Sequence, residues 1–395
     1  MHGEAFARDP GPAYARLRAA GPAAWAELAP SVLGLVVTDY QAALEVLTNP
    51  AVFSKDARRW EALVQGQVPP DSPVLAMMAP RPSLLYADGD DHTRLRWAME
   101  DCLARVNAHQ VRAVTRTSAR SLIARIAPTG RADLMGDYAD TVPLLVFAHL
   151  LGCPTETSGR MVAACQGMIN AGPDAPKASA DLVACLGETA RLKQDRPGQD
   201  VTSWMLAHPA QLSIEEVIHQ LVVVIGAGTI PTAAWIAQAL LLLLSDDDYA
   251  GSLAGGTASV TRALEKVLWL RSPMANFSVH YARHATRLRG VHIPQGVPVL
   301  ISHAAANTDP TLPDVGYANR SHLAWSAGPH RCPATGLASI IAETAIETIL
   351  DRLWDMALDK EKTTNRHGPF HQCPAHVPVH FAPKPSHAAP VGGTA

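Results

Sequence analysis

Residues 325–334 read WSAGPHRCPA, and this stretch leaves two interpretations of the chain open. Cys332 stands among Gly, Pro, His and Arg, and an apolar segment follows it. A free cysteine usually packs as a small hydrophobic residue. A cysteine in such a setting can also be a metal ligand. The rest of the sequence has to decide whether Cys332 is a packed core residue or a metal ligand.

The composition indicates a globular protein with an extensive core. The chain has 395 residues, of which 48% are hydrophobic and 17% charged, and its formal net charge is −3. This composition excludes a disordered chain, and the charge gives no basic field for a nucleic-acid partner. The six cysteines are scattered without a CxxC pair, so reduced thiols and a cytoplasmic location are expected. The first residues, MHGEAFARDP, lack the apolar core of a signal peptide.

One segment, residues 221–244, is long and apolar enough to cross a membrane. Gly226, Gly228 and Pro231 interrupt it, and three aspartates follow it. A helix that is apolar all round also belongs in the middle of a large protein. We therefore expect a buried central helix and no membrane partner.

Helical periodicity dominates the chain and predicts one mainly helical domain with small β-sheets. The expected helices cover residues 12–20, 40–47, 91–106, 109–127, 138–151, 158–171, 178–194, 213–245, 258–270 and 333–353. Strand signals lie at 277–282, 290–296 and 297–301, and a long functional loop is expected at 61–90. We see no linker, so we expect a flexible N-terminus at 1–8, a single domain at 9–383 and a disordered tail at 384–395.

Four separated segments match one family in order. They are HTRLR at 92–96, GAGTIPT at 226–232, RGVHIPQGVPV at 289–299 and WSAGPHRC at 325–332, with AAANTDP at 304–310 before the last. The chain thus resembles the cytochrome P-450 superfamily of haem-thiolate monooxygenases, in its soluble bacterial or actinomycete form, over residues 9–381. The resemblance implies a mainly α fold with small β-sheets (α+β), a triangular prism with a long central distal helix. It also implies heme b, iron protoporphyrin IX, as the cofactor.

The resemblance assigns the proximal side of the haem to the opening stretch. Cys332 is the expected axial iron ligand, because a thiolate pushes electron density toward the iron and favours O–O cleavage. Pro333 suits the first position of the following helix, whose amides at Ala334 and Thr335 would point at the sulfur. The other haem contacts expected on this side are Trp325, Gly328 and Ala338.

The two haem propionates need cationic or donor partners. His92 and Arg96 are four residues apart and share one helix face, and arginine suits a carboxylate. His330 falls where the family places a third partner, and His280 where it places a fourth, commonly Arg. The alternative is that these are surface histidines and a solvated arginine.

The distal side is expected to use Ala227, Gly228, Pro231 and Thr232. Gly228 would let the central helix approach the haem closely, although a helix-packing glycine is the alternative. The family's acid and threonine, which help to deliver protons, are replaced by Ile230 and Pro231. Pro231 removes the amide that would bond the Ala227 carbonyl, so we expect a permanent opening that holds a water. Thr232 supplies a hydroxyl one position later, turned by about 100°. The expected substrate contacts are Val223, Ala227, Met274, Asn276 and Phe277.

The proximal support also departs from the family. Lys266 and Trp269 occupy the positions of the family's Glu-x-x-Arg, and a shifted alignment on Glu265 and Arg271 has the wrong spacing. We expect the whole ion-pair network to be lost, since a lone buried charge is costly. Further changes are Trp325-Ser326 for the usual Phe-Gly, and Ala334 for a Gly.

Three functions compete. The first is a monooxygenase that hydroxylates, epoxidises or couples an apolar small molecule of secondary metabolism, with electrons from a separate ferredoxin and ferredoxin reductase, or from peroxide. The second is a haem- or ligand-binding protein of the same fold without oxygenase turnover, which the distal departures motivate. The third is a zinc module built from His371, Cys373, His376 and His380, whose spacing matches no usual zinc pattern.

Overall fold

The structure is a computed structural model of the whole chain, and it describes residues 1–169, 175–245, 257–313, 317 and 319–385. The helices are α1 Glu4–Arg8, α2 Gly11–Ala20, α3 Tyr40–Thr48, α4 Glu61–Val64, α5 Leu75–Met78, α6 Gly89–Ala104, α7 Ala108–Ile126, α8 Thr141–Leu150, α9 Thr155–Ile169, α10 Ala175–Asp195, α11 Val201–Leu206, α12 Ile214–Ser245, α14 Thr257–Leu270, α15 His303–Asn307 and α16 Thr335–Arg352. The strands are β1 Ala23–Ala29, β2 Val32–Val37, β3 Phe53–Ser54, β4 Arg131–Asp133, β5 Asn276–Ala282, β6 Thr286–Leu288, β7 Val291–Ile293, β8 Pro298–Ser302, β9 Ala357–Leu358, β10 Thr364–Asn365, β11 Pro374–His376 and β12 Pro378–His380.

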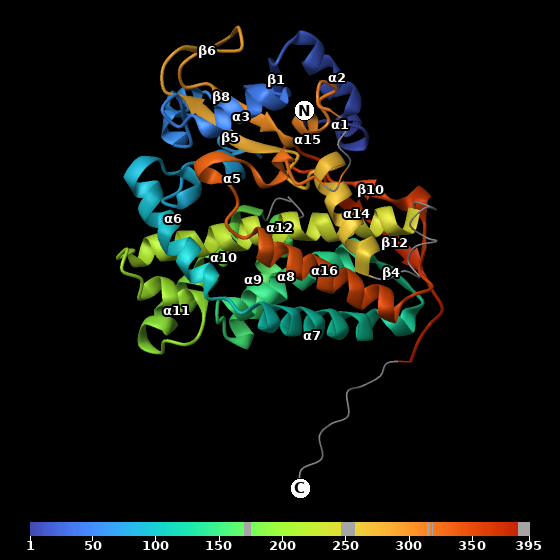
Figure 1. Cartoon of the computed structure of the whole chain (residues 1–395). Helices are drawn as coiled ribbons and strands as arrows, with labels where there is room; N and C mark the ends of the chain where they lie inside the picture. The colour runs from blue at the N-terminus through green and yellow to red at the C-terminus, as the bar shows by residue number, and fades with distance from the viewer. Residues whose placement is uncertain (170–174, 246–256, 314–316, 318, 386–395) are drawn as a thin grey trace.

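The fold has a small β-rich part beside a larger helical part, as the sequence predicts (Figure 1). The main sheet has the order β1-β2-β8-β5-β3, and β2 and β8 run parallel while the other neighbours are antiparallel. Of the β1–β2 hairpin the sequence predicts only a short extended region around Val36–Val37, and it does not predict α11. Short helices α4 and α5 lie within the expected loop at 61–90.

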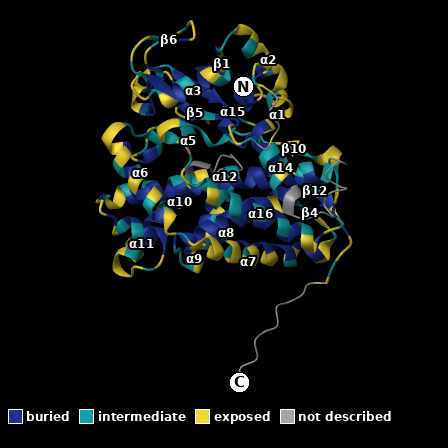
Figure 2. Ribbon diagram, viewed as in Figure 1, coloured by how far each residue is buried: buried dark blue, intermediate teal, exposed yellow. Residues whose placement is uncertain are grey.

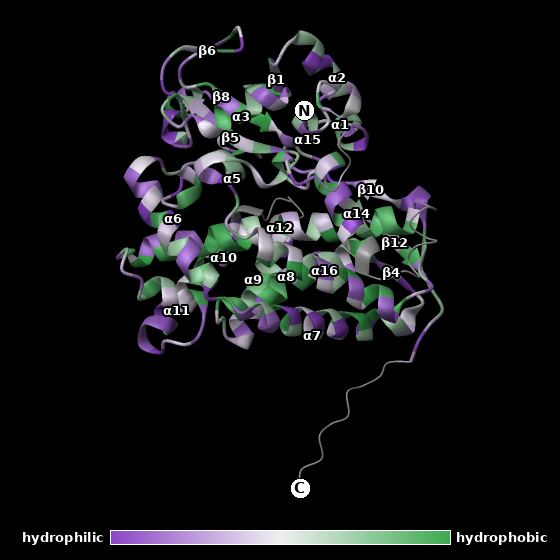
Figure 3. Cartoon of the chain, in the orientation of Figure 1, coloured by the Kyte–Doolittle hydropathy of each residue, from purple (hydrophilic) through white to green (hydrophobic). Residues whose placement is uncertain are grey.

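Helix α12 forms the centre of the helical part, and its dark-blue colour in Figure 2 marks it as buried. It packs against α8, α10, α14 and α16. Figure 3 shows hydrophobic residues concentrated in these inner helices and hydrophilic residues on the outer face of α7. By length and composition alone α12 could span a membrane, but most of its apolar window is buried inside the protein. A core helix passes the same test, so this is weak evidence for a membrane span.

Pro231 lies inside α12, and the helix continues through it from Ile214 to Ser245. The ring removes one amide, so the Ala227 carbonyl has lost its usual helical donor. A permanent opening of the helix was expected from the sequence. The structure corrects this to one missing hydrogen bond in a continuous helix.

Candidate functional site

The cysteine loop is held in shape by backbone contacts. The Cys332 amide donates to the Trp325 carbonyl at 2.9 Å. Gly328 has φ +65°, and a β-carbon there would lie 2.1 Å from the Leu47 carbonyl oxygen, so only glycine fits. The indole of Trp325 packs edge-on against Trp235 of α12 at 5.3 Å between ring centroids. The loop is thereby fixed against both α3 and the central helix.

The Cys332 sulfur accepts one backbone hydrogen bond, from the Ala334 amide at 3.4 Å. Helix α16 begins at Thr335 rather than at the expected Pro333, and Ala334 is its N-cap. Burial raises the pKa of the Cys332 thiol in the chain without cofactor, while the Ala334 amide, Arg96 and Arg331 act in the opposite direction. A metal ion would be needed to hold this buried sulfur as a thiolate.

His92 of α6 and His330 of the cysteine loop come together although they are far apart in sequence. Their ring centroids are 4.0 Å apart, and the buried atoms Nε2 of His92 and Nδ1 of His330 have no hydrogen-bond partner. Burial lowers the pKa of both imidazoles, and for His330 the nearby Lys55 adds to the effect. Two partnerless ring nitrogens on neighbouring imidazoles, each able to donate in one tautomer, fit a carboxylate acceptor such as a haem propionate.

Arg96 contacts the cysteine loop directly. Its guanidinium donates to the Arg331 carbonyl at 2.6 Å and to Glu100 at 2.7 Å. His280 is 3% exposed on β5, with Nδ1 3.1 Å from the Ser278 carbonyl, and burial lowers its pKa well below the ordinary value. The four expected propionate partners therefore border one region. His92 and His280 are buried and His330 is half-buried, so none of the three is a solvated surface histidine.

Three positions on α12 and at the start of α16 are uncovered by the described part of the chain. Ala227 is exposed in the middle of an otherwise buried helix, and Val223, one turn earlier, is half-buried. A β-carbon added to Gly226 of α12 or to Gly336 of α16 would meet nothing within 4 Å. Ala338 follows on the first turns of α16 and is half-buried. These uncovered positions, on the central helix and on the helix that follows Cys332, leave room for a flat group such as haem.

Gly228 has the packing role that was the alternative to a distal-pocket role. A β-carbon at Gly228 would lie 2.5 Å from the ring of Phe147 on α8, so the residue is a helix-packing glycine. Thr232 is five residues beyond Ala227 and therefore points about 140° away from it. Its side chain is buried, at 3% exposure. The expected hydroxyl is thus turned away from the open side of α12.

Asn276 is also corrected as a substrate contact. Its amide is completely buried and is bonded to the Tyr14 hydroxyl at 3.0 Å and to the Pro369 carbonyl at 2.7 Å. Phe277 lies on the opposite face of β5 and borders a pocket with Met77, Met78 and Tyr86. Met274 precedes the strand, and its carbonyl oxygen accepts a hydrogen bond from Nδ1 of His303 at 3.0 Å.

The proximal network is rebuilt rather than lost. The Trp269 indole N–H donates to the Asn319 carbonyl at 2.7 Å, and its ring packs edge-on against His322. Glu265 lies 3.1 Å from Arg320 and 3.6 Å from His322. The sequence reasoning missed this set because Glu265 stands one position before the family's Glu, and because Arg320 and His322 follow no expected motif.

Ser326 stands where the family has glycine, and its backbone is strained. It has φ 60° and ψ −172°, a region that is essentially reserved for glycine. The Ser326 hydroxyl lies 3.4 Å from the Ser278 hydroxyl. The chain therefore keeps a strained serine beside the cysteine loop.

The zinc hypothesis finds no geometric support. Among the described residues, no group of three or more His, Cys, Asp or Glu side chains could hold a metal ion. His376 instead pairs with Asp133 at 2.7 Å, and His380 lies in β12, which pairs with β4 and β9.

Comparisons with known proteins agree with this geometry. No family model matches the chain. The cytochrome P450 monooxygenase PikC of Streptomyces venezuelae is 30% identical over 373 residues, covering 90% of this chain and 87% of that protein. The 2-hydroxy-5-methyl-1-naphthoate 7-hydroxylase of Streptomyces carzinostaticus is 27% identical, covering 87% of this chain and 88% of that protein. Among solved structures, CYP154C4 from Streptomyces sp. W2061 has a TM-score of 0.84 at 25% identity, covering 94% of this chain and 95% of that one.

Proposed function

Because the chain belongs to the cytochrome P450 family, whose cofactor is haem, we propose that it is a monooxygenase that hydroxylates or epoxidises an apolar natural-product intermediate. The observation that carries the proposal is the pair of partnerless nitrogens of His92 and His330 at the Cys332 loop, together with the exposure of Ala227 on the central helix. The relatives include a mycinamicin IV hydroxylase/epoxidase and a vitamin D(3) 25-hydroxylase. Such names favour a bulky, largely apolar substrate.

Each part of the site has a defined task in this proposal. Bound haem supplies oxygen activation, which a thiolate ligand favours. Cys332 is the ligand, and the Ala334 amide stabilises negative charge on its sulfur. His92, His280 and His330 bind the propionates, while Arg96 ties the cysteine loop to α6. Val223, Ala227, Met274 and Phe277 border the substrate, with Trp325, Gly328 and Ala338 shaping the proximal side.

Proton delivery follows from the two distal replacements. Ile230 and Pro231 carry no acid or hydroxyl, and Thr232 points away from Ala227. The Ala227 carbonyl, freed by Pro231, is the acceptor on this stretch of α12 that can hold a water. We propose that this water, rather than Thr232, carries protons to the site. Electrons come from a separate ferredoxin and its reductase.

A turnover experiment tests the proposal against its alternatives. Substrate-induced shifts of the Soret band select ligands, and NADPH-dependent product formation with a surrogate ferredoxin and reductase is then measured for each. Product formation supports the monooxygenase. Product formed only with peroxide would assign a peroxide-driven enzyme. Ligand binding without product under either condition would favour the binding protein that the missing acid and threonine suggest.

A further inference from the structure

Lys55 is a buried cation that none of the family motifs includes. It directly follows β3, and the residue is 6% exposed. Burial lowers the pKa of its ammonium to about 8, against a weaker opposing effect of Asp88. Among the described residues, its ammonium forms no hydrogen bond or ion pair, and its contact is the Phe277 ring at 5.9 Å. A buried ammonium without a partner is costly and calls for an anion.

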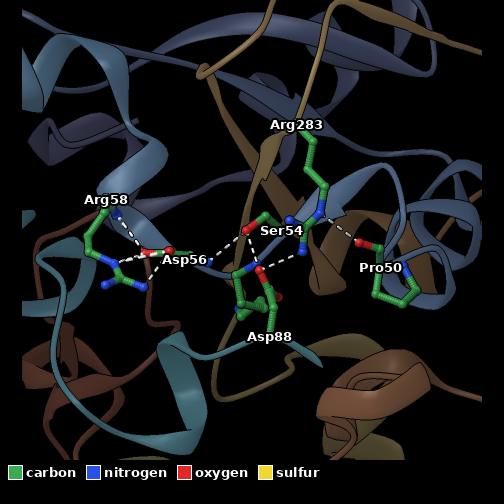
Figure 4. Close-up of polar contacts among 7 residues, drawn as sticks. Pro50, Ser54, Asp56, Arg58, Asp88 and Arg283 are labelled. Carbon is green, nitrogen blue, oxygen red and sulfur yellow. Dashed lines mark hydrogen bonds and ion pairs between the residues drawn. The ribbon is translucent and has the colours of Figure 1, made fainter. Parts of the chain in front are cut away.

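Asp88 is the acid that acts on the Lys55 ammonium, but its carboxylate is already hydrogen-bonded to other groups (Figure 4). Its carboxylate accepts a short hydrogen bond from the Ser54 hydroxyl and another from the Lys55 backbone amide at 3.0 Å. The Arg283 guanidinium lies 2.9 Å from the same carboxylate and also donates to the Pro50 carbonyl at 3.0 Å. Asp88 is thus neutralised by Arg283, and the ammonium of Lys55 remains uncompensated.

The strand register brings Lys55 beside the histidines of the site. Phe53 pairs with Ala282 and Ser54 with Tyr281, so the next position along this antiparallel pair sets Lys55 opposite His280. The charge of Lys55 lowers the pKa of His280 and of His330, as a second cause after burial. One ammonium and the imidazoles of His280, His330 and His92 therefore border the same region.

The other side of Lys55 is apolar. It borders the pocket formed with Met77, Met78, Tyr86 and Phe277. This pocket has a volume of only about 10 Å³, so the anion that Lys55 meets lies on its histidine side.

We propose that Lys55 is the central cation of a carboxylate-binding site, which it forms together with His280 and His330. The inference rests on the proposed function, which gives His280 and His330 a haem propionate. Lys55 then meets either that propionate or the carboxylate of an acidic substrate that lies beside it. The two sources share one chemistry, a charge-assisted hydrogen bond to the ammonium.

The test compares the purified holoprotein with Lys55→Met and Lys55→Arg. Lys362→Met, which removes an exposed ammonium, is the matched control. One arm measures the rate of haem transfer to excess apomyoglobin. The other measures, by Soret titration, how much more tightly dodecanoic acid binds than its methyl ester. Circular dichroism checks the fold, and Lys55→Gln replaces the Met variant if that chain does not fold.

Each outcome has a defined meaning. Faster haem loss in Lys55→Met, by about ten- to a hundredfold and restored by Arg, assigns the propionate. Loss of the acid preference with unchanged haem transfer assigns the substrate. If both readouts of Lys55→Met match wild type and Lys362→Met, the site is overturned. A wild-type protein with no Soret band would instead refute the proposed function.

Discussion

Replacing Ser326 by glycine should stabilise the protein, although the substitution removes a side chain. A non-glycine residue at φ 60° and ψ −172° carries strain of about 1–3 kcal/mol. Glycine relieves that strain but gives back about 0.4–1 kcal/mol as extra freedom of the unfolded chain. The hydroxyl contact with Ser278 at 3.4 Å is long, so its loss costs at most about 0.5 kcal/mol. The net expectation is a gain of about 1 kcal/mol.

Urea unfolding of the ferric holoprotein, followed by the Soret band and by circular dichroism, measures this gain. With a slope of about 3 kcal/mol/M, the midpoint should rise by about 0.3 M in Ser326→Gly. Ser326→Ala is the matched control, because it keeps the β-carbon and the strain but loses the hydroxyl, and its midpoint should equal or fall below wild type. A Ser326→Gly midpoint at or below that of Ser326→Ala would refute the strain argument.

Three further substitutions test other parts of the site. Trp269→Phe leaves the Asn319 carbonyl without its donor and should destabilise the holoprotein by about 1–3 kcal/mol in the same urea assay; an unchanged midpoint would mean that the rebuilt network gives no support. Thr232→Val should keep the ratio of product formed to oxygen consumed within about twofold of wild type, because the hydroxyl points away from Ala227. A large drop in that ratio would show that Thr232 takes part in proton delivery. Burial lowers the pKa of His303 from 6.5 to about 4, so between these pH values the unfolded chain binds a proton that the folded chain does not. The free energy of unfolding therefore falls as the pH drops from 6.5 toward 4. His303→Gln should reduce this fall by up to about 3 kcal/mol, and an unchanged pH profile of stability would contradict the argument.

Local sequence signals predict the long elements and the cysteine loop well. The uniform apolar character of α12 and the Gly-x-His-x-Cys spacing each lie within one segment, so no partner is needed to interpret them. The same holds for His92 and Arg96, whose spacing sets them on one face of α6.

The corrected residues depend on partners from distant segments. Gly228 faces Phe147, which comes from another helix, and Asn276 is bonded to Tyr14, 262 positions away. No local pattern shows which of two glycine roles applies, or that an amide is already satisfied. Lys55 was missed for the same reason, since its significance depends on the strand pairing that sets it opposite His280.

The departures around the iron leave one question central: whether Cys332 ligates the haem as a thiolate in this altered shell. The carbon monoxide difference spectrum of the reduced protein at neutral pH answers it most directly. The account predicts the thiolate-ligated band in wild type, and its loss in Cys332→Ser with the fold retained. A wild-type spectrum with only the band of a neutral ligand, or a thiolate band that survives in Cys332→Ser, would contradict the account.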